Sequence, residues 1–255
     1  MNSVPGPRSR PETIVMVMPV YNERENIPLL IEKFSPVRNR ISDFSIEICF
    51  VDDDSPDGTG TVISELSEVH GWVHLLHRDE KEGLGMAYLA GFDYALEHLD
   101  PDFLGQMDSD LSHDPEVIIS MVKCLEAGSD VVIGSRYTNG GRIEGWPLPR
   151  RIISRGGNIF ARYIGGISGV KDCTSGFRLI KSDKLRTCLS SGMIPTRGYS
   201  FQIHLLSSLI DSESVVTEVP MVFKERVHGQ SKLGNGDVRE FISTVSRLRF
   251  SGKGD

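Results

Sequence analysis

Residues 46–60 read IEICFVDDDSPDGTG, an apolar run that passes directly into an acidic turn with proline and glycine. A short run that is continuously apolar and rich in β-branched residues is typical of a strand buried on both faces of a parallel sheet. Residues 57–69 then carry apolar side chains at every third or fourth position, which predicts a helix. The stretch therefore indicates a strand, an acidic loop and a helix in succession.

The same order recurs on both sides of this stretch. Further strands are predicted at residues 14–18, 73–76, 103–107 and 130–133, and helices at residues 84–98 and 115–126. Strands that alternate with helices of this length favour right-handed crossovers and a mainly parallel sheet. We therefore predict a Rossmann-like α/β fold with helices on both faces of the sheet.

The composition is that of an ordinary globular protein. Of the 255 residues, 39% are hydrophobic and 25% are charged, and the formal net charge is −7. Such a charge argues against a general nucleic-acid binder. The four cysteines lack CxxC spacing, so the sequence suggests neither a zinc site nor a disulfide framework, and a reducing compartment fits best.

The boundaries of the domain follow from the ends of these patterns. Residues 1–12 are rich in proline, serine and arginine and are expected to be a flexible tail. They lack the apolar segment of a signal peptide. Residues 13–236 are expected to form one domain, with a late strand at 215–223. Residues 237–255 are expected to be a C-terminal helix and tail. No run approaches the roughly 18 apolar residues of a membrane span.

Two acidic clusters stand at predicted strand ends. Asp53 and its neighbours follow one strand, while Asp108 and Asp110 follow another. Ligands of open α/β sheets bind at the carboxyl ends of the strands, so both clusters can face one crevice. An Asp-x-Asp turn can hold Mg²⁺ or Mn²⁺ against a diphosphate. Capping is the alternative role, and we favour it for Asp57 and Asp114.

Two further side chains leave alternatives open. Arg136 follows the strand at 130–133, where its guanidinium can reach a phosphate or can hold its own loop to an acidic neighbour; we favour the phosphate. His113, next to the Asp-x-Asp turn, can act as base or ligand, or can bond to the backbone, and we favour neither of the first two roles over the backbone role.

Residues 149–164 read PRRIISRGGNIFARYI and mix arginines with aliphatic and aromatic residues. This pattern is typical of an amphipathic helix that lies on a membrane surface. An ordinary surface helix fits the sequence equally well.

Nine blocks of the chain, in order, resemble one family. They begin at residues 18, 51, 81, 107, 134, 150, 174, 198 and 219, and read MPVYNERENI, VDDDSPDGT, KEGLGMAY, MDSDLSH, GSRY, RRIISRGGN, TSGFRLI, GYSFQI and VPMVFKERVHGQSKL. Together they resemble the dolichyl-phosphate, or polyprenyl-phosphate, mannosyltransferases, which are inverting family 2 glycosyltransferases with the GT-A fold. VDDDSPDGT and the Asp-x-Asp turn are widely shared among relatives, whereas ISRGGN, GYSFQI and ERVHGQSKL point to the polyprenyl-phosphate branch.

The resemblance implies roles for residues on the donor side. The guanine and ribose pocket would be lined by Pro19, Tyr21, Glu23, Val51 and Asp53. Mg²⁺ or Mn²⁺ and the diphosphate would be held by Asp108 and Asp110, with Ser109 beside them. Ser112 stands where many relatives have a glutamine that reaches the metal, so the shorter side chain puts its direct ligand role in question.

The resemblance also implies the catalytic and acceptor residues. Asp110, Arg136 and Arg226 would act in catalysis, and Arg226 and Lys232 would belong to a loop that closes over the donor diphosphate. The phosphate of a lipid acceptor would meet Arg150, Arg151, Ser154 and Arg155. The acyl region of the lipid would meet Ile152, Ile153, Ile159 and Phe160.

The implied reaction is transfer of mannose from GDP-mannose to dolichyl or polyprenyl phosphate, with inversion at the sugar carbon. An ionised phosphate attacks without a strong general base. The protein would lie peripherally on the cytoplasmic face of the endoplasmic reticulum, or of the plasma membrane in a prokaryote, and a membrane-spanning partner subunit is conceivable. Glucosyl transfer from a UDP-sugar and a non-catalytic nucleotide- or lipid-binding subunit are the alternatives.

Overall fold

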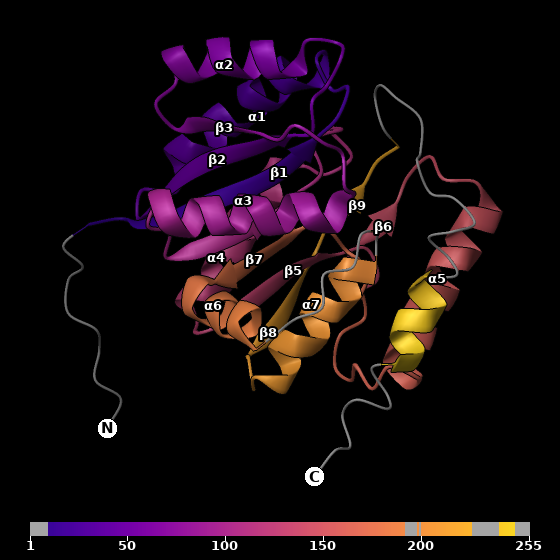
Figure 1. Cartoon of the computed structure of the whole chain (residues 1–255). Coiled ribbons are helices and arrows are strands. Elements are labelled where there is room, and N and C mark those ends of the chain that lie inside the picture. Colours follow the sequence, from indigo (N-terminus) through magenta and orange to yellow (C-terminus); the bar gives the residue numbers. More distant parts are fainter. Residues whose placement is uncertain (1–9, 192–197, 199, 226–239, 248–255) are drawn as a thin grey trace, which may run out of the picture.

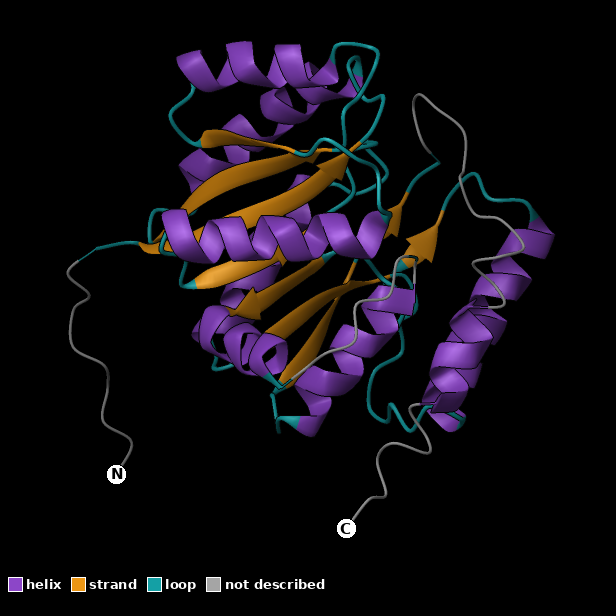
Figure 2. Ribbon diagram, in the orientation of Figure 1, coloured by secondary structure: helices purple, strands orange, loops and turns teal. Residues whose placement is uncertain are grey.

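The core of the protein is one sheet with helices on both faces, as Figures 1 and 2 show. The structure is a computed structural model and describes residues 10–191, 198, 200–225 and 240–247. In spatial order, the strands of this sheet are β3 (Val73–His77), β2 (Phe44–Asp52), β1 (Glu12–Val20), β4 (Phe103–Gln106), β7 (Arg178–Lys181), β5 (Val131–Ser135) and β8 (Val216–Pro220).

The predicted α/β fold is confirmed by the pairing of these strands. β1 runs parallel to β2, with Ile14 opposite Ile46, and parallel to β4, with Val17 opposite Gln106. β2 in turn runs parallel to β3, and β5 runs parallel to β8. The loops that follow β1, β2 and β4 therefore lie at one edge of the sheet.

Alternate side chains of β1 enter two separate cores, which explains why the run is apolar throughout. Ile14 and Met16 pack with Phe34 on one face, while Val15 and Val17 pack on the other face. All four strand side chains are wholly buried.

The helices divide between these two faces according to the cores they complete. One face is covered by α1 (Asn26–Arg40), α2 (Thr59–Val69) and α4 (Ile118–Glu126), which follows the short 3-10 helix η1 (Pro115–Val117). The other face is covered by α3 (Leu84–His98), α6 (Ser182–Ser190) and α7 (Ser200–Asp211).

β7 departs from the predicted parallel order. It lies between β4 and β5 and runs antiparallel to both, with Arg178 opposite Gln106 and Ile133. The chain thus leaves the carboxyl edge of the sheet after β5 and returns to the same edge before β7. The late strand predicted at 215–223 is also divided. After β8, the chain forms β9 (Val222–Phe223), which pairs with β6 (Arg142–Ile143) in a two-stranded sheet.

The segment between β6 and β7 contains α5 (Leu148–Tyr163), which stands apart from the sheet (Figure 1). Residues 240–247, which fall within the predicted C-terminal helix, are helical and lie beside α5. The rings of Phe160 and Phe241 are 6.4 Å apart. At the other end of the chain, residues 1–9 lie outside the described residues, and Arg10 pairs with Asp102 at 3.3 Å.

Candidate functional site

The predicted donor residues meet at the carboxyl edge of the sheet. Pro19 and Tyr21 lie at the end of β1, Asp53 follows β2, and the Asp-x-Asp turn follows β4. The Ser109 hydroxyl donates to the carbonyl of Pro19 at 3.3 Å, which joins the turn to β1. Both acidic clusters therefore lie at this edge, and a crevice that they share stays a prediction.

The Asp-x-Asp turn is held by its own backbone. Asp110 is 3% exposed, and its Oδ1 accepts from the backbone N–H of Ser112 at 3.0 Å. Leu111 between them has a positive φ of 62°, which a residue other than glycine rarely adopts. This strained conformation is typical of functional sites.

His113 holds the turn in place through a hydrogen bond to its backbone. Its Nδ1 accepts the backbone N–H of Asp108 at 3.3 Å, so the backbone role is the one that the structure shows. The ring is buried between Phe177 and Phe223, at 5.3 and 5.2 Å between ring centroids. Burial lowers the pKa of His113, although both neighbouring aspartates oppose the shift. The histidine is therefore neutral and positions the turn.

The residues present fit a hard divalent cation. Asp108 and Asp110 offer carboxylate oxygens from one turn, and the buried hydroxyl of Ser112 has no hydrogen-bond partner among the described residues. Mg²⁺ and Mn²⁺ prefer such oxygen ligands and retain open positions for phosphate and water. No cluster of three or more acidic, histidine or cysteine side chains that could hold a metal occurs in the described part of the chain, so substrate and water would complete the shell.

Two cations that the sequence analysis missed contact the predicted nucleoside pocket. Arg78 donates to Asp53 at 2.8 Å, and both side chains are largely buried. Burial raises the pKa of Asp53, and Arg78 only partly offsets this effect. The ammonium of Lys81 lies 3.4 Å from the centroid of the Tyr21 ring. Lys81 begins the KEGLGMAY block, which could have signalled a role for this loop.

The other two pocket residues differ in their availability. The side chain of Val51 is wholly buried in the core, which leaves only its backbone for a nucleotide. Glu23 is half-buried, and its carboxylate accepts from the side-chain amide of Asn26 at 2.6 Å. Its backbone N–H donates to Thr59 at 2.9 Å, which ties the loop after β1 to the start of α2.

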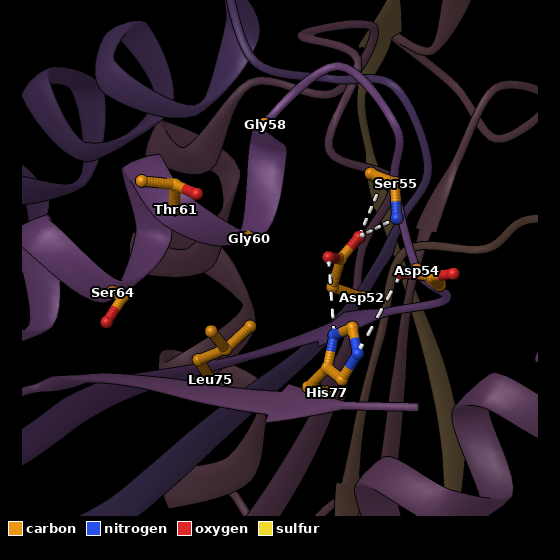
Figure 3. Close-up of a pocket in the computed structure, with 9 residues that line it drawn as sticks. All are labelled: Asp52, Asp54, Ser55, Gly58, Gly60, Thr61, Ser64, Leu75 and His77. Carbon is orange, nitrogen blue, oxygen red and sulfur yellow. Dashed lines mark hydrogen bonds and ion pairs between the residues drawn. The ribbon is translucent and has the colours of Figure 1, made fainter. Parts of the chain in front are cut away.

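Asp52 and Asp53 have different surroundings. Asp52 lies beside a hollow of about 430 Å³ (Figure 3). Its carboxylate accepts from the Ser55 hydroxyl at 2.5 Å and lies 3.8 Å from the ring of His77. Asp57 accepts from the backbone N–H of Thr59 at 3.0 Å in the turn before α2, and the N-cap itself is Gly58. The hollow is lined by Asp52, Asp54, Ser55, Gly58, Gly60, Thr61, Ser64, Leu75 and His77.

Arg136 has an acidic partner within its own chain. Two of its guanidinium nitrogens donate to the carboxylate of Asp172, at 2.8 and 2.6 Å, and both residues are buried. Burial by itself would raise the pKa of Asp172, but the charge and hydrogen bonds of Arg136 outweigh it and hold that pKa below its ordinary value. The structure thus shows the alternative role of Arg136, that of fixing its loop, and contact with a phosphate stays a prediction.

α5 is connected to Arg136 through hydroxyl groups. The Thr174 hydroxyl accepts from Arg136 at 2.7 Å and from the side-chain amide of Asn158 at 3.0 Å. The Ser154 hydroxyl accepts from Tyr137 at 2.7 Å. One side of α5 therefore borders the loop that follows β5.

The predicted acceptor arginines have contacts of their own. Arg150 lies 3.4 Å from Glu225 and 3.9 Å from the centroid of the Trp146 ring, and Arg151 donates to the carbonyl of Ile143. Arg155 is exposed, 6.0 Å from the Tyr137 ring. Their placement on α5 is as predicted, and their contact with a phosphate stays a prediction.

The outer side of α5 is apolar and exposed. Ile152 and Ile153 are 62% and 64% exposed, and Leu148, Ile159 and Tyr163 are exposed as well. Phe160 is half-buried and its ring packs against Phe241, so its contact with an acyl chain stays a prediction. Within the described residues, every helix is too short or too polar to traverse a bilayer.

Arg226 and Lys232 lie outside the described residues. The chain enters that segment close to the Asp-x-Asp turn, because the backbone N–H of Lys224 donates to the carbonyl of Ser112 at 3.0 Å.

Solved structures with this fold include several glycosyltransferases. A glucosyl-3-phosphoglycerate synthase from Mycobacterium tuberculosis superposes with a TM-score of 0.67 over 96% of this chain and 81% of that chain, at 20% sequence identity. The mannosyltransferase PcManGT from Pyrobaculum calidifontis, solved in complex with GDP-Man and Mn²⁺, has a TM-score of 0.57 over 97% of this chain and 72% of that chain, at 16% identity. At such identities the likeness establishes the fold alone.

Sequence comparison is more specific. A polyprenol monophosphomannose synthase of Mycolicibacterium smegmatis is 37% identical, over 99% of this chain and 97% of that protein. A dolichol-phosphate mannosyltransferase of Pyrococcus furiosus is 36% identical, over 92% of this chain and 63% of that protein. The model of Glycosyl transferase family 2 matches residues 15–189. The chain therefore belongs to glycosyl transferase family 2.

Proposed function

We propose that this protein transfers mannose from GDP-mannose to a polyprenyl or dolichyl phosphate, with a divalent cation and with inversion at the sugar carbon. The observation that carries the proposal is the Asp108–Asp110 turn, at the same sheet edge as Tyr21 and Asp53, with a Ser112 hydroxyl that no described residue pairs with. The names of the relatives that are 36–37% identical support the choice of mannose and of a lipid phosphate.

On the donor side, each residue has a task that its surroundings suit. Asp53 is buried and can accept hydrogen bonds from the ribose or the base, and the Tyr21 ring offers a flat surface to the base. Asp108, Asp110 and Ser112 would hold Mg²⁺ or Mn²⁺. When bound, the cation supplies positive charge that stabilises the departing diphosphate.

On the acceptor side, the nucleophile is an ionised phosphate oxygen. It forms the new bond to the anomeric carbon as the bond to the diphosphate breaks, so an α-linked donor yields a β-linked product. The arginines of α5 reduce the repulsion between the two anions, and Arg136, paired with Asp172, holds the neighbouring loop in place. The apolar side of α5 would rest on the membrane, at the cytoplasmic face, where the lipid acceptor is presented.

The direct test uses purified protein with Mn²⁺ or Mg²⁺, GDP-mannose and a short-chain polyprenyl phosphate in detergent-free liposomes. We expect a β-linked mannosyl lipid, inhibited by GDP much more strongly than by UDP. Asp108→Asn and Asp110→Asn should each reduce kcat at least about 100-fold, since removal of one preorganised charge-stabilising group typically costs that much.

The alternatives have their own outcomes in this assay. Product from UDP-glucose, with UDP as the stronger inhibitor, would indicate glucosyl transfer. Donor binding without product would indicate a non-catalytic subunit. Product that appears only after other membrane proteins are added would indicate a membrane-spanning partner.

A further inference from the structure

A buried glutamine lies beside the Asp-x-Asp turn. Gln202 is on α7 and is 3% exposed, and its side-chain Oε1 is buried without a hydrogen-bond partner among the described residues. A buried amide oxygen that stays unpaired costs free energy, so such groups are usually kept for a ligand or a water molecule.

Arg178 fixes the position of Gln202. This arginine is wholly buried and donates to the backbone carbonyl of Gln202 at 2.8 Å and to the backbone carbonyl of Cys173 at 2.9 Å. It thereby joins α7 to the loop that precedes β7. Arg178 therefore fixes the backbone at Gln202, from which the amide side chain extends.

Gly176 shows where this amide points. A β-carbon at Gly176 would lie 3.5 Å from Oδ1 of Asp108 and 3.8 Å from Nε2 of Gln202. Asp108 Oδ1 and Gln202 Nε2 thus both lie next to the position that a side chain at Gly176 would fill. Under the proposed function, Asp108 holds the metal and the diphosphate, and the sugar is attached directly to that diphosphate.

We propose that Gln202 is a specificity-determining residue that binds a hydroxyl of the donor sugar and supplies no base to the acceptor. The inference rests on the proposed function. An amide offers a hydrogen-bond donor and an acceptor together, which matches a sugar hydroxyl. An amide does not take up a proton, so an uncharged alcohol acceptor gains no help from it.

An ionised phosphate acceptor needs no such help. Its oxygen forms the bond to the anomeric carbon, the bond from that carbon to the oxygen of GDP breaks, and the electron pair leaves with GDP. No proton is transferred in this step. A carboxylate at the position of Gln202 would instead repel the acceptor phosphate and could activate water as a general base.

The first experiment separates binding of the sugar from binding of the nucleotide. Gln202→Leu keeps a side chain of similar size and removes the amide. With Mn²⁺ present, we expect its affinity for GDP-mannose, measured by calorimetry, to fall about tenfold, because one hydrogen-bonded hydroxyl is lost, while its affinity for GDP is unchanged.

A variant with a carboxylate at this position, Gln202→Glu, tests the effect of a negative charge on the acceptor phosphate. We expect Gln202→Glu to raise the KM for polyprenyl phosphate and to lower mannosyl transfer at least about tenfold, more strongly as the pH rises and the new carboxylate ionises. Hydrolysis of GDP-mannose by water should increase in the same variant.

Gly176→Ala tests the same space without changing Gln202. Its methyl group would only contact Asp108 and Gln202, so the fold should be kept, yet it fills the gap that we assign to the sugar. We expect weaker binding of GDP-mannose and unchanged binding of GDP. Gly71→Ala is the matched control, because a β-carbon at Gly71 meets no atom within 4 Å and lies before β3.

The outcomes distinguish this inference from the proposed function. If the unmodified protein forms no mannosyl lipid, the proposed function is wrong. If it is active, and both Gln202→Leu and Gly176→Ala bind GDP-mannose as well as it does, the inference about Gln202 is overturned and the function stands. Equal loss of affinity for GDP and GDP-mannose also overturns it, because Gln202 then has only a structural role.

Discussion

At the scale of single residues, the sequence predicted the positions of the aspartates at the strand ends better than the ion pairs that the arginines form. Asp53, Asp108 and Asp110 could be placed because the carboxyl ends of parallel strands meet at one edge. Their partners could not. Asp172, which binds Arg136, and Arg78, which binds Asp53, lie 36 and 25 residues away from those partners. Periodicity reports which face a side chain occupies, and it does not report which distant loop is folded against it.

The buried pair of Arg136 and Asp172 leads to a stability prediction. Asp172→Asn leaves the buried guanidinium without its counter-charge, so we expect the free energy of unfolding near pH 7 to fall by about 3–5 kcal/mol. Because the folded-state pKa of Asp172 is depressed, its contribution is fully present above its unfolded pKa of about 4 and is lost as the pH falls through the folded value. Urea unfolding at pH 7 and at pH 3 measures both effects.

The difference in the free energy of unfolding between the unmodified protein and Asp172→Asn should therefore be smaller at pH 3 than at pH 7. Asp100→Asn is the control, since Asp100 is 95% exposed and its pairing with Arg10 contributes little. A difference of the same size at both pH values would show that the ion pair is not what stabilises this loop.

At the scale of elements, the strands β1 to β5 and the helices α2, α3 and α4 were predicted within a few residues, whereas β6, β7, α6 and α7 were not. The helix predicted at residues 84–98 matches α3. β7 escaped notice because only Leu179 and Ile180 in it are apolar, and neither its burial nor its direction is encoded locally. It is a strand because β4 and β5 flank it. The break between β8 and β9 likewise depends on two different partner strands.

The amphipathic helix α5 gives the prediction that belongs to this scale. Replacing Ile152 and Ile153 together by alanine removes six exposed carbon atoms, and each buried CH₂ contributes about 0.8 kcal/mol to membrane binding. We expect liposome binding, measured by co-sedimentation, to weaken at least about tenfold. Turnover of a water-soluble short-chain acceptor should stay near that of the unmodified protein.

Val69→Ala is the matched control for this experiment. Val69 is 75% exposed but lies at the end of α2, away from α5. Equal liposome binding by the double variant and the unmodified protein would contradict an interfacial role for α5 and favour the ordinary surface helix.

At the scale of the whole molecule, the donor site joins elements that are far apart in the sequence, so its ligands should stabilise the fold as a unit. A ligand at 100 times its Kd contributes about 2.7 kcal/mol, which corresponds to a rise of roughly 5–10 °C in Tm for a chain of this size. We expect this shift with GDP and Mn²⁺ together in differential scanning calorimetry. Asp108→Asn should abolish the part that depends on Mn²⁺, and a shift that survives in this variant would place the cation elsewhere.

One consequence follows from the reversed direction of β7. The excursion from Arg136 to Phe177 starts and finishes on one rim of the sheet, and it carries α5 and its arginines. A hairpin-like insert of this kind can be exchanged for another without disturbing the strands that bear the nucleotide pocket. Enzymes built on this scaffold can therefore acquire a new recipient for the sugar by grafting a single contiguous stretch of chain.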